Sequence, residues 1–282
     1  MPNARALRRR IQSVKSTQQI TRAMKVVSAA KLYRAQKNAL AAKPYARQLK
    51  ALFARLVAQT EDADLPLLQK REIKRTLVIL ITGNRGLAGG FNNALIRRAL
   101  LEQGDSTSYI AFGSKGRDAL VSAGCTVTAS YCQTNDRLLP VEAEKLGQQV
   151  IALFESGACD CVKLVYQQFL SAGSQMPNTD TLLPVQTVSN DSEGDFTGDC
   201  LFEGGRREIL EAVARRYVCS GILQAVMESS AGEHLARMLA MSAATDNASD
   251  MIRRLQMDYN RSRQAAVTQE IAEISGCANA VM

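Results

Sequence analysis

Apolar positions recur every three or four residues near both ends of this chain, which is the spacing of one face of an α-helix. No proline lies between Pro2 and Pro44 and the first glycine is Gly83, so this stretch predicts one long helix. Pro44 is expected to kink that helix or to start a second segment. The expected inward stripe, whose phase slips near Gln18, consists of Leu7, Ile11, Val14, Ile20, Met24, Val27, Leu32 and Ala35, and continues after the proline with Leu49, Leu52, Phe53 and Leu56.

The C-terminal end shows a second helical pattern, which runs from Arg206 to Ile274 and is interrupted only by Gly221 and Gly232. Its seam has coiled-coil spacing, with small residues that allow a partner helix to approach closely. Two helices of this length extend far beyond a compact domain of about 130 residues, so we expect them to pair with each other, antiparallel. The seam residues are Met238, Met241, Thr245, Ala248, Ile252, Leu255, Tyr259, Ser262 and Ala266.

Between these helices the pattern alternates between strand and helix, which is typical of a Rossmann-like α/β domain. The predicted fold class is therefore α/β, with a long antiparallel coiled coil of the N- and C-terminal helices plus a Rossmann-like domain. The expected division is 1–60 and 205–282 for the paired helices and 70–200 for the domain. Within it we expect strands at 76–82, 109–113, 125–131, 161–170 and near 181–188, helices at 91–101, 114–124 and 141–154, and a closing loop at 189–199.

Charge is distributed unevenly along the chain. The 282 residues carry a net charge of +8, yet residues 1–60 contain 14 Lys and Arg and no acid, and Glu61 is the first carboxylate. Four interpretations of this basic arm are open. It could bind nucleic-acid phosphates, contact an acidic partner protein, serve as a transit peptide, or form a solvated helix face. The arm lacks interleaved aromatic residues, which argues against single-strand recognition, and its helix runs unbroken to Arg47, which argues against a cleaved peptide. The residues alone leave the partner of the arm open.

The glycine-rich turn at 82–92 follows a strand and precedes a helix, where phosphate-binding loops occur. It lacks the G-x-G-x-x-G spacing, and no G-x-x-x-x-G-K-[ST] motif exists anywhere in the chain. We therefore interpret it as a tight turn that exposes Arg85 for contact, and predict no cofactor.

Other catalytic chemistry is equally sparse. A single histidine, His234, excludes a multi-histidine metal site, and we expect it to be a partly exposed helix residue rather than a general base. Seven cysteines at irregular spacing, without a C-x-x-C pair, are typical of reduced thiols in a cytosolic compartment. No apolar run approaches the roughly 20 residues of a membrane span. We predict no catalytic residue and no metal site.

Four segments of this sequence resemble one known family. Residues 8–32, RRRIQSVKSTQQITRAMKVVSAAKL, resemble the N-terminal signature of the F-type ATP synthase gamma subunit, and residues 234–276 resemble its C-terminal signature. The turn ITGNRGLAGGFN at 81–92 and LFEGGRREILEAVARRY at 201–217 match two further motifs of that family.

The resemblance implies a non-catalytic rotor in the central stalk. In that family the coiled coil lies inside a ring of alpha and beta subunits, and the globular part sits on the ring of c subunits with the epsilon subunit. Ion flow turns this rotor, which drives the catalytic sites through ATP synthesis or hydrolysis. The implied location is the cytoplasmic side of the bacterial plasma (inner) membrane, as a peripheral protein that binds no nucleic acid.

The resemblance also assigns subunit contacts residue by residue. Met24 and Lys25 match a collar that faces acidic loops of the beta subunits, whereas Arg263, Gln264 and Thr268 match residues that meet the beta-subunit catch loop. Two positions depart from the family: Asn84 replaces its usual Asp, and Ser242 replaces its common Lys. The regulatory dithiol insertion of chloroplast members is not expected between residues 189 and 205.

Overall fold

The structure, a computed structural model, describes residues 4–58, 65–69, 71–104, 106–132, 139–171, 174–185 and 205–280. The described chain divides into two compact units, Met1–Ala29 with Arg237–Met282 and Ala30–Ala236. Both long helices contribute to both units. The loop expected at 189–199, Cys200 and most of the segment expected to lack a dithiol insertion lie outside the described residues, and the domain boundaries expected from the sequence stay a prediction.

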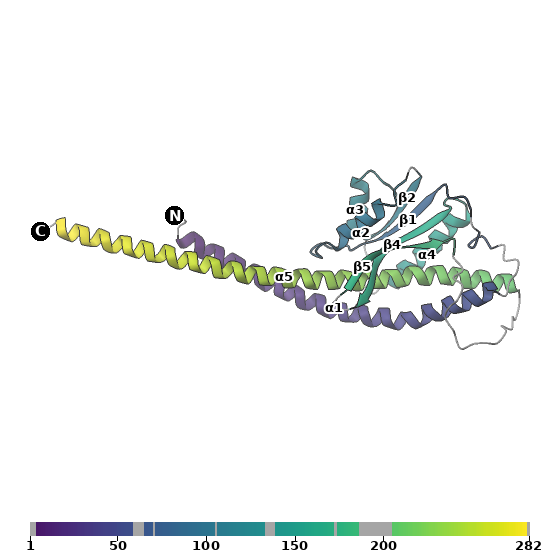
Figure 1. Cartoon of the computed structure of the whole chain (residues 1–282), viewed down its shortest axis with the longest axis horizontal. Helices are drawn as coiled ribbons and strands as arrows, with labels where there is room; N and C mark the ends of the chain where they lie inside the picture. The colour runs from purple at the N-terminus through teal and green to yellow at the C-terminus, as the bar shows by residue number, and fades with distance from the viewer. Residues whose placement is uncertain are drawn as a thin grey trace. The chain divides into compact units, whose positions relative to one another are not determined.

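The order of elements confirms the predicted alternation between two long terminal helices (Figure 1). The helices are α1 (Ala4–Ala58), α2 (Phe91–Leu100), α3 (Ser114–Ser122), α4 (Leu139–Glu155) and α5 (Arg206–Ala280). The strands are β1 (Thr76–Ile81), β2 (Thr107–Phe112), β3 (Thr126–Tyr131), β4 (Cys161–Ser171) and β5 (Ser174–Leu183).

The strands form one sheet in the order β3-β2-β1-β4-β5. The first four run parallel, as β-α-β crossovers require, and only β5 is antiparallel. This order, with β1 beside both β2 and β4, is the doubly wound arrangement of Rossmann-like domains. The α/β prediction is therefore confirmed.

The last strand lies earlier in the chain than the sequence predicts. We expected a strand near 181–188, whereas β5 spans Ser174–Leu183 and pairs with β4. It contains Pro177 and is mostly exposed or half-buried, with only Leu182 and Leu183 at its end buried. Hydrophobicity therefore marks the end of this edge strand and misses its start.

Two apolar clusters cover the two faces of the sheet. On one face Leu146 and Phe154 of α4, Ile222 of α5 and Phe53 of α1 are buried against the sheet, and the rings of Phe53 and Tyr217 stack with centroids 5.2 Å apart. On the other face α2 and α3 contribute the buried residues Leu95, Ala99 and Leu120. A sheet covered on both faces explains why β1 reads as the continuous apolar run TLVILI.

In the unit formed by the two chain ends, α1 and α5 pair antiparallel. Gln18 Nε2 donates to Ser249 Oγ at 2.7 Å, and Lys25 Nζ donates to Ser242 Oγ at 2.9 Å. The later residue of α1 thus contacts the earlier residue of α5, so the predicted antiparallel pairing is confirmed. The seam on α5 is buried or half-buried from Met238 to Ser262, as predicted, but Ala266 is exposed.

The inward face of α1 differs from the predicted stripe. Ile20 and Val27 are 60% and 57% exposed, whereas the polar Gln18 and Thr21 lie half-buried on the paired face. The helix keeps the phase set by Leu7, Ile11 and Val14, so no slip occurs near Gln18. The apolar prediction was wrong here because the polar side chains on this face satisfy one another across the pair.

Pro44 does not start a second segment, since α1 is a single helix that contains it. Proline removes one backbone donor and leaves the carbonyl four residues earlier, at Leu40, without its usual partner. Both Leu40 and Pro44 are exposed, so water can satisfy that carbonyl. Buried Leu32 and Leu49 hold the helix on either side of the proline.

Candidate functional site

The glycine-rich turn joins β1 to α2, as predicted. Arg85 is exposed, and Leu87 beside it is 63% exposed with φ of +62°, a left-handed conformation that is rare for a branched side chain. Gly89 shares this conformation, with φ of +58°. The tip of the turn therefore presents one cation and one apolar side chain to its surroundings.

His234 is buried, with 7% of its surface exposed, so the expectation of a partly exposed helix residue was wrong. Burial follows from the packing of α5 in this stretch, where Ala231, Gly232 and Leu235 are also buried and more than one helix face is covered. Among the described residues, no group of three or more His, Cys, Asp or Glu side chains is arranged to hold a metal ion.

Cys125, Cys132, Cys159, Cys161 and Cys219 are free thiols. Burial raises the pKa of Cys159 and of Cys219 to about 11. Burial also raises the pKa of the Cys125 and Cys161 thiols above their ordinary value. A thiol held protonated at neutral pH is a poor nucleophile and a poor metal ligand, so these four are structural residues.

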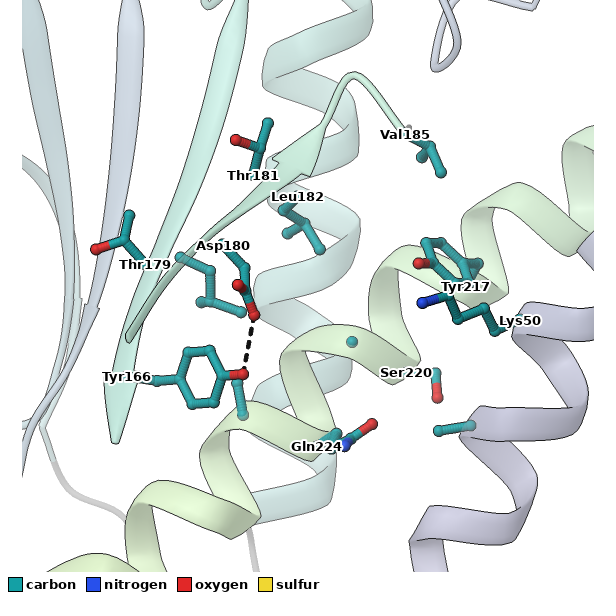
Figure 2. Close-up of a pocket in the computed structure, with 14 residues that line it drawn as sticks. Lys50, Tyr166, Thr179, Asp180, Thr181, Leu182, Val185, Tyr217, Ser220 and Gln224 are labelled. Carbon is teal, nitrogen blue, oxygen red and sulfur yellow. Dashed lines mark hydrogen bonds between the residues drawn. The ribbon is translucent and has the colours of Figure 1, made fainter. Parts of the chain in front are cut away.

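A cavity of about 450 Å³ lies between α1, α5 and the β4–β5 hairpin (Figure 2). Figure 2 shows Lys50 beside Tyr217 at one side of it and Tyr166 beside Asp180 at the other. The Tyr166 hydroxyl donates to Asp180 Oδ2 at 2.9 Å, and Asn178 Nδ2 donates to Oδ1 at 2.9 Å. Burial raises the pKa of Tyr166 above its ordinary value. With both carboxylate oxygens engaged and the phenol protonated, the cavity contains no poised acid-base pair.

The residues predicted to form the collar lie next to each other on the paired part of α1. Met24 is half-buried and Lys25 is exposed. The bond from Lys25 Nζ to Ser242 Oγ holds this ammonium against α5 at Ser242, the position that the resemblance matches to a lysine. Serine there accepts a hydrogen bond and avoids a like-charge pair.

The predicted catch-loop residues lie on the exposed face of α5. Arg263, Gln264 and Thr268 are all exposed, and the Thr268 hydroxyl donates to the Gln264 carbonyl at 2.9 Å, one turn away. Arg263 follows Ser242 by 21 residues, which is about 32 Å of helix at 1.5 Å per residue. The structure therefore brings Lys25 together with Ser242 and groups the catch-loop residues, but these are two separate places on the coiled coil.

Sequence reasoning missed the apolar surface beside the collar. Ile20, Val26 and Val27 are 60%, 65% and 57% exposed on α1, on either side of Met24 and Lys25. Ile20 and Val27 lie seven residues apart, about two turns along the same face of α1, and exposed apolar surface on one helix face favours a contact site. The sequence could have shown that these side chains face outward, because they fall outside the three- and four-residue spacing that begins at Leu7.

A protein-family model described as ATP synthase matches residues 3–281. The ATP synthase gamma chain of Desulforamulus reducens is 42% identical over 283 residues, and that of Moorella thermoacetica is 40% identical over 284 residues; each match covers all of both chains. This chain belongs to the ATP synthase gamma chain family.

The fold of this chain is similar to that of chains in solved ATP synthase structures. The rotor of Euglena gracilis mitochondrial ATP synthase is 20% identical with a TM-score of 0.67, and the match covers 94% of this chain and 98% of that one. The central stalk and c-ring structure of Tetrahymena thermophila mitochondrial ATP synthase contains a chain that is 21% identical, with a TM-score of 0.58 over 80% of this chain and 99% of that one.

Among its described residues, this gamma chain contains no helix that combines the length and the apolar character needed to span a bilayer.

Proposed function

We propose that this chain is the non-catalytic rotor of the central stalk in a bacterial F-type ATP synthase. Its α1–α5 coiled coil turns inside the ring of alpha and beta subunits, and the α/β body meets the c-ring and the epsilon subunit. The observation that carries the proposal is the end-to-end match with gamma chains in a chain whose ends form an antiparallel coiled coil. The complex places it at the cytoplasmic side of the plasma (inner) membrane.

The division of labour follows the expected segments. Residues 1–60 and 205–282 form the shaft, and residues 70–200 form the body. Ion flow, whether of H⁺ or Na⁺, drives the c-ring, and the shaft transmits the rotation to the catalytic sites, which lie in other subunits. The chain itself binds no nucleotide in this function.

The collar acts through charge and apolar contact together. Lys25 is exposed within an arm that has no carboxylate before Glu61, and Ile20 and Val27 are exposed beside it. Acidic loops of the beta subunits are attracted to this arm without one fixed contact, with a strength that varies with the angle of rotation, because screened surface charges act over roughly 10 Å. Each such pair contributes about 0–1 kcal/mol, so no single Lys or Arg is indispensable.

Reconstitution tests the proposal. We expect the purified chain alone to hydrolyse no ATP, and the alpha and beta subunits to acquire full ATPase activity only when it is added. Hydrolysis by the isolated chain would overturn the proposal, and so would assembly of a fully active complex without it. Steep salt-dependent binding to DNA or RNA without any subunit assembly would favour the nucleic-acid alternative instead.

A second experiment tests the catch-loop assignment. The variant R263A/Q264A should lower turnover of the reconstituted complex while leaving the thermal unfolding of the free chain unchanged, because both side chains are exposed. The matched control is R254A/Q256A, which removes the same residue types from exposed positions on the same helix. Equal turnover in the two variants would contradict the assignment of Arg263 and Gln264.

A further inference from the structure

The sheet has one topological switch point, between β1 and β4. From β1 the chain turns through residues 83–90 into α2 and continues to β2 on one side, whereas β4 pairs with β1 on the other side. In doubly wound sheets, ligands bind in the crevice outside the carboxyl ends of the strands at such a point. Gly83 lies there, two residues after the end of β1.

A side chain of the protein itself occupies this position. A Cβ atom built on Gly83 would lie 2.6 Å from Glu233 Cδ, 2.7 Å from Oε1 and 3.0 Å from Oε2. The carboxylate of Glu233, which comes from α5, therefore packs directly against the Gly83 backbone. A side chain on residue 83, or a phosphate group at this place, could enter only by displacing the Glu233 carboxylate.

The polar groups around the turn are already engaged within the protein. Gly83 N donates to Asn92 Oδ1 at 2.9 Å, and the Gly83 carbonyl accepts from Lys115 N at 3.2 Å. Asn84 Oδ1 accepts from Ser114 N at 2.9 Å, at the start of α3. These bonds hold the turn in one shape, with Gly83 presented to α5.

Electrostatics favours a carboxylate here. Helices α2 and α3 both begin at this edge of the sheet, at Phe91 and Ser114, and neither has an acidic residue in its first turn. The N-terminal end of a helix carries partial positive charge and attracts anions. Glu233 brings a negative charge from α5 to the Gly83 backbone, whose carbonyl accepts from Lys115 N in the first turn of α3.

Neighbouring residues of α5 also approach the sheet closely. A Cβ on Gly232 would lie 2.6 Å from Gln175 Oε1 and 2.8 Å from Gln167 Cγ. One turn earlier, Phe169 N donates to Glu228 Oε2 at 3.4 Å. Residues 228–233 thus dock α5 against the ends of β4, β5 and the glycine-rich turn.

We propose that the switch-point crevice is an internal docking site whose ligand is the Glu233 carboxylate, and that this contact fixes the rotational setting of α5 against the α/β body. The inference rests on the proposed rotor function where it assigns a mechanical role, since α5 is the helix that continues into the shaft. This chain thus fills the switch-point crevice of its sheet with a side chain of its own helix α5.

Alanine at Gly83 is the sharpest probe of the contact. Gly83 has no positive φ, so its backbone accepts alanine, and the atoms in the way are the flexible end of Glu233. G83A should displace the carboxylate without unfolding the chain. Gly90, in the same turn, is the matched control, because a Cβ there meets nothing within 4 Å and its φ is −80°.

Hydrogen exchange of the full-length free chain measures the docking. We expect the amides of residues 84–92 and 228–236 to exchange about tenfold faster in G83A and in E233A. A change of this size is typical when the contact between two neighbouring residues is lost and the local structure opens more often. The double variant should exchange no faster than either single variant, because both remove the same contact. E233Q, which keeps the shape and loses the charge, should fall between wild type and E233A. Additive effects, or a G83A chain that behaves like G90A, would overturn the docking site.

The mechanical role has its own readout. In the reconstituted complex in membranes, G83A should lower the ratio of ATP-driven ion pumping to ATP hydrolysis relative to G90A. An unchanged ratio in a chain that has lost docking by hydrogen exchange would overturn the mechanical role. Failure of the wild-type chain to assemble with alpha and beta subunits would instead count against the proposed rotor function, and the exchange result on the free chain would stand.

Discussion

Thr21 Oγ1 and Thr245 Oγ1 lie 2.8 Å apart across the coiled coil, so two hydroxyls bond to each other at a position where apolar residues usually pack. Thr21 Oγ1 also lies 3.0 Å from the Gln18 carbonyl, and Thr245 Oγ1 lies 2.7 Å from the Met241 carbonyl. Each hydroxyl has one proton, so one threonine donates within its own helix while the other donates across the pair.

This hydroxyl pair predicts a non-additive response to mutation. T245V should lower the free energy of unfolding by about 1 kcal/mol, because the half-buried Thr21 loses its cross-helix partner. T21V/T245V should recover part of that loss, since two apolar groups of the same shape replace both partners. Urea unfolding of wild type, T21V, T245V and T21V/T245V measures the cycle. Thr17, which is exposed and bonds only its own helix at Ser13, provides the control T17V.

The outward position of Ile20 predicts a tolerant site on the free chain. I20Q should change the free energy of unfolding by less than about 0.5 kcal/mol, because the side chain is 60% exposed. V14Q, on the half-buried paired face, should cost about 1–3 kcal/mol. We also expect I20Q to weaken assembly with the alpha and beta subunits. A larger stability loss for I20Q than for V14Q would show that the helix faces are reversed.

Asp160 predicts a pH-dependent contribution to stability. Its Oδ2 accepts from Arg75 N at 2.9 Å and from Lys74 N at 3.1 Å, and these bonds hold the pKa of the carboxyl below its ordinary value of 3.8. The folded pKa lies below the unfolded one, so the stabilisation is complete above about pH 4 and is lost as the pH falls through the folded pKa.

D160N should therefore unfold more easily at neutral pH, by about 1–3 kcal/mol for bonds to a charged acceptor. The difference between wild type and D160N should shrink as the pH drops below 4, and thermal unfolding over a pH series measures it. A difference that stays constant down to the acid limit would contradict the assigned role of the charge. Asp118, an exposed aspartate on α3, provides the control D118N.

The buried thiols predict slow alkylation. With a pKa of about 11, Cys159 and Cys219 are thiolate in only about one molecule per thousand at pH 8. Iodoacetamide under native conditions should therefore modify the half-exposed Cys132 well before either of them, as followed by peptide mass spectrometry. Denaturant should abolish the difference. Rapid native modification of Cys159 would contradict its burial.

The parts of the fold that the sequence predicted well have a strong local signal. The strand β1 is covered on both faces and so reads as an uninterrupted apolar run, and α3 was placed to within two residues because glycine-containing turns bound it. The edge strand β5 was misplaced because one covered face and a proline leave little periodic signal. The catch-loop and collar residues rest on resemblance alone, since exposed polar side chains on a helix have no pattern that identifies a partner.

Burial at the coiled coil and at α5 was harder to predict. Ile20 and Val27 were assigned inward because they are apolar, yet Gln18 and Thr21 lie inward because the partner helix satisfies their polar groups at Ser249 and Thr245. His234 was expected to be partly exposed because it lies beside Glu233 in a helical pattern. Its burial depends on the packing of α5 in that stretch.

The sequence by itself determined the helical ends, the alternating middle, the basic arm and the absence of a nucleotide fingerprint, because each of these is written in the spacing or identity of neighbouring residues. Tertiary structure alone decided which face of each helix is covered and what fills the crevice at Gly83. The carboxylate there belongs to a residue 150 positions later in the chain, and only the packing of α5 against the sheet brings the two together.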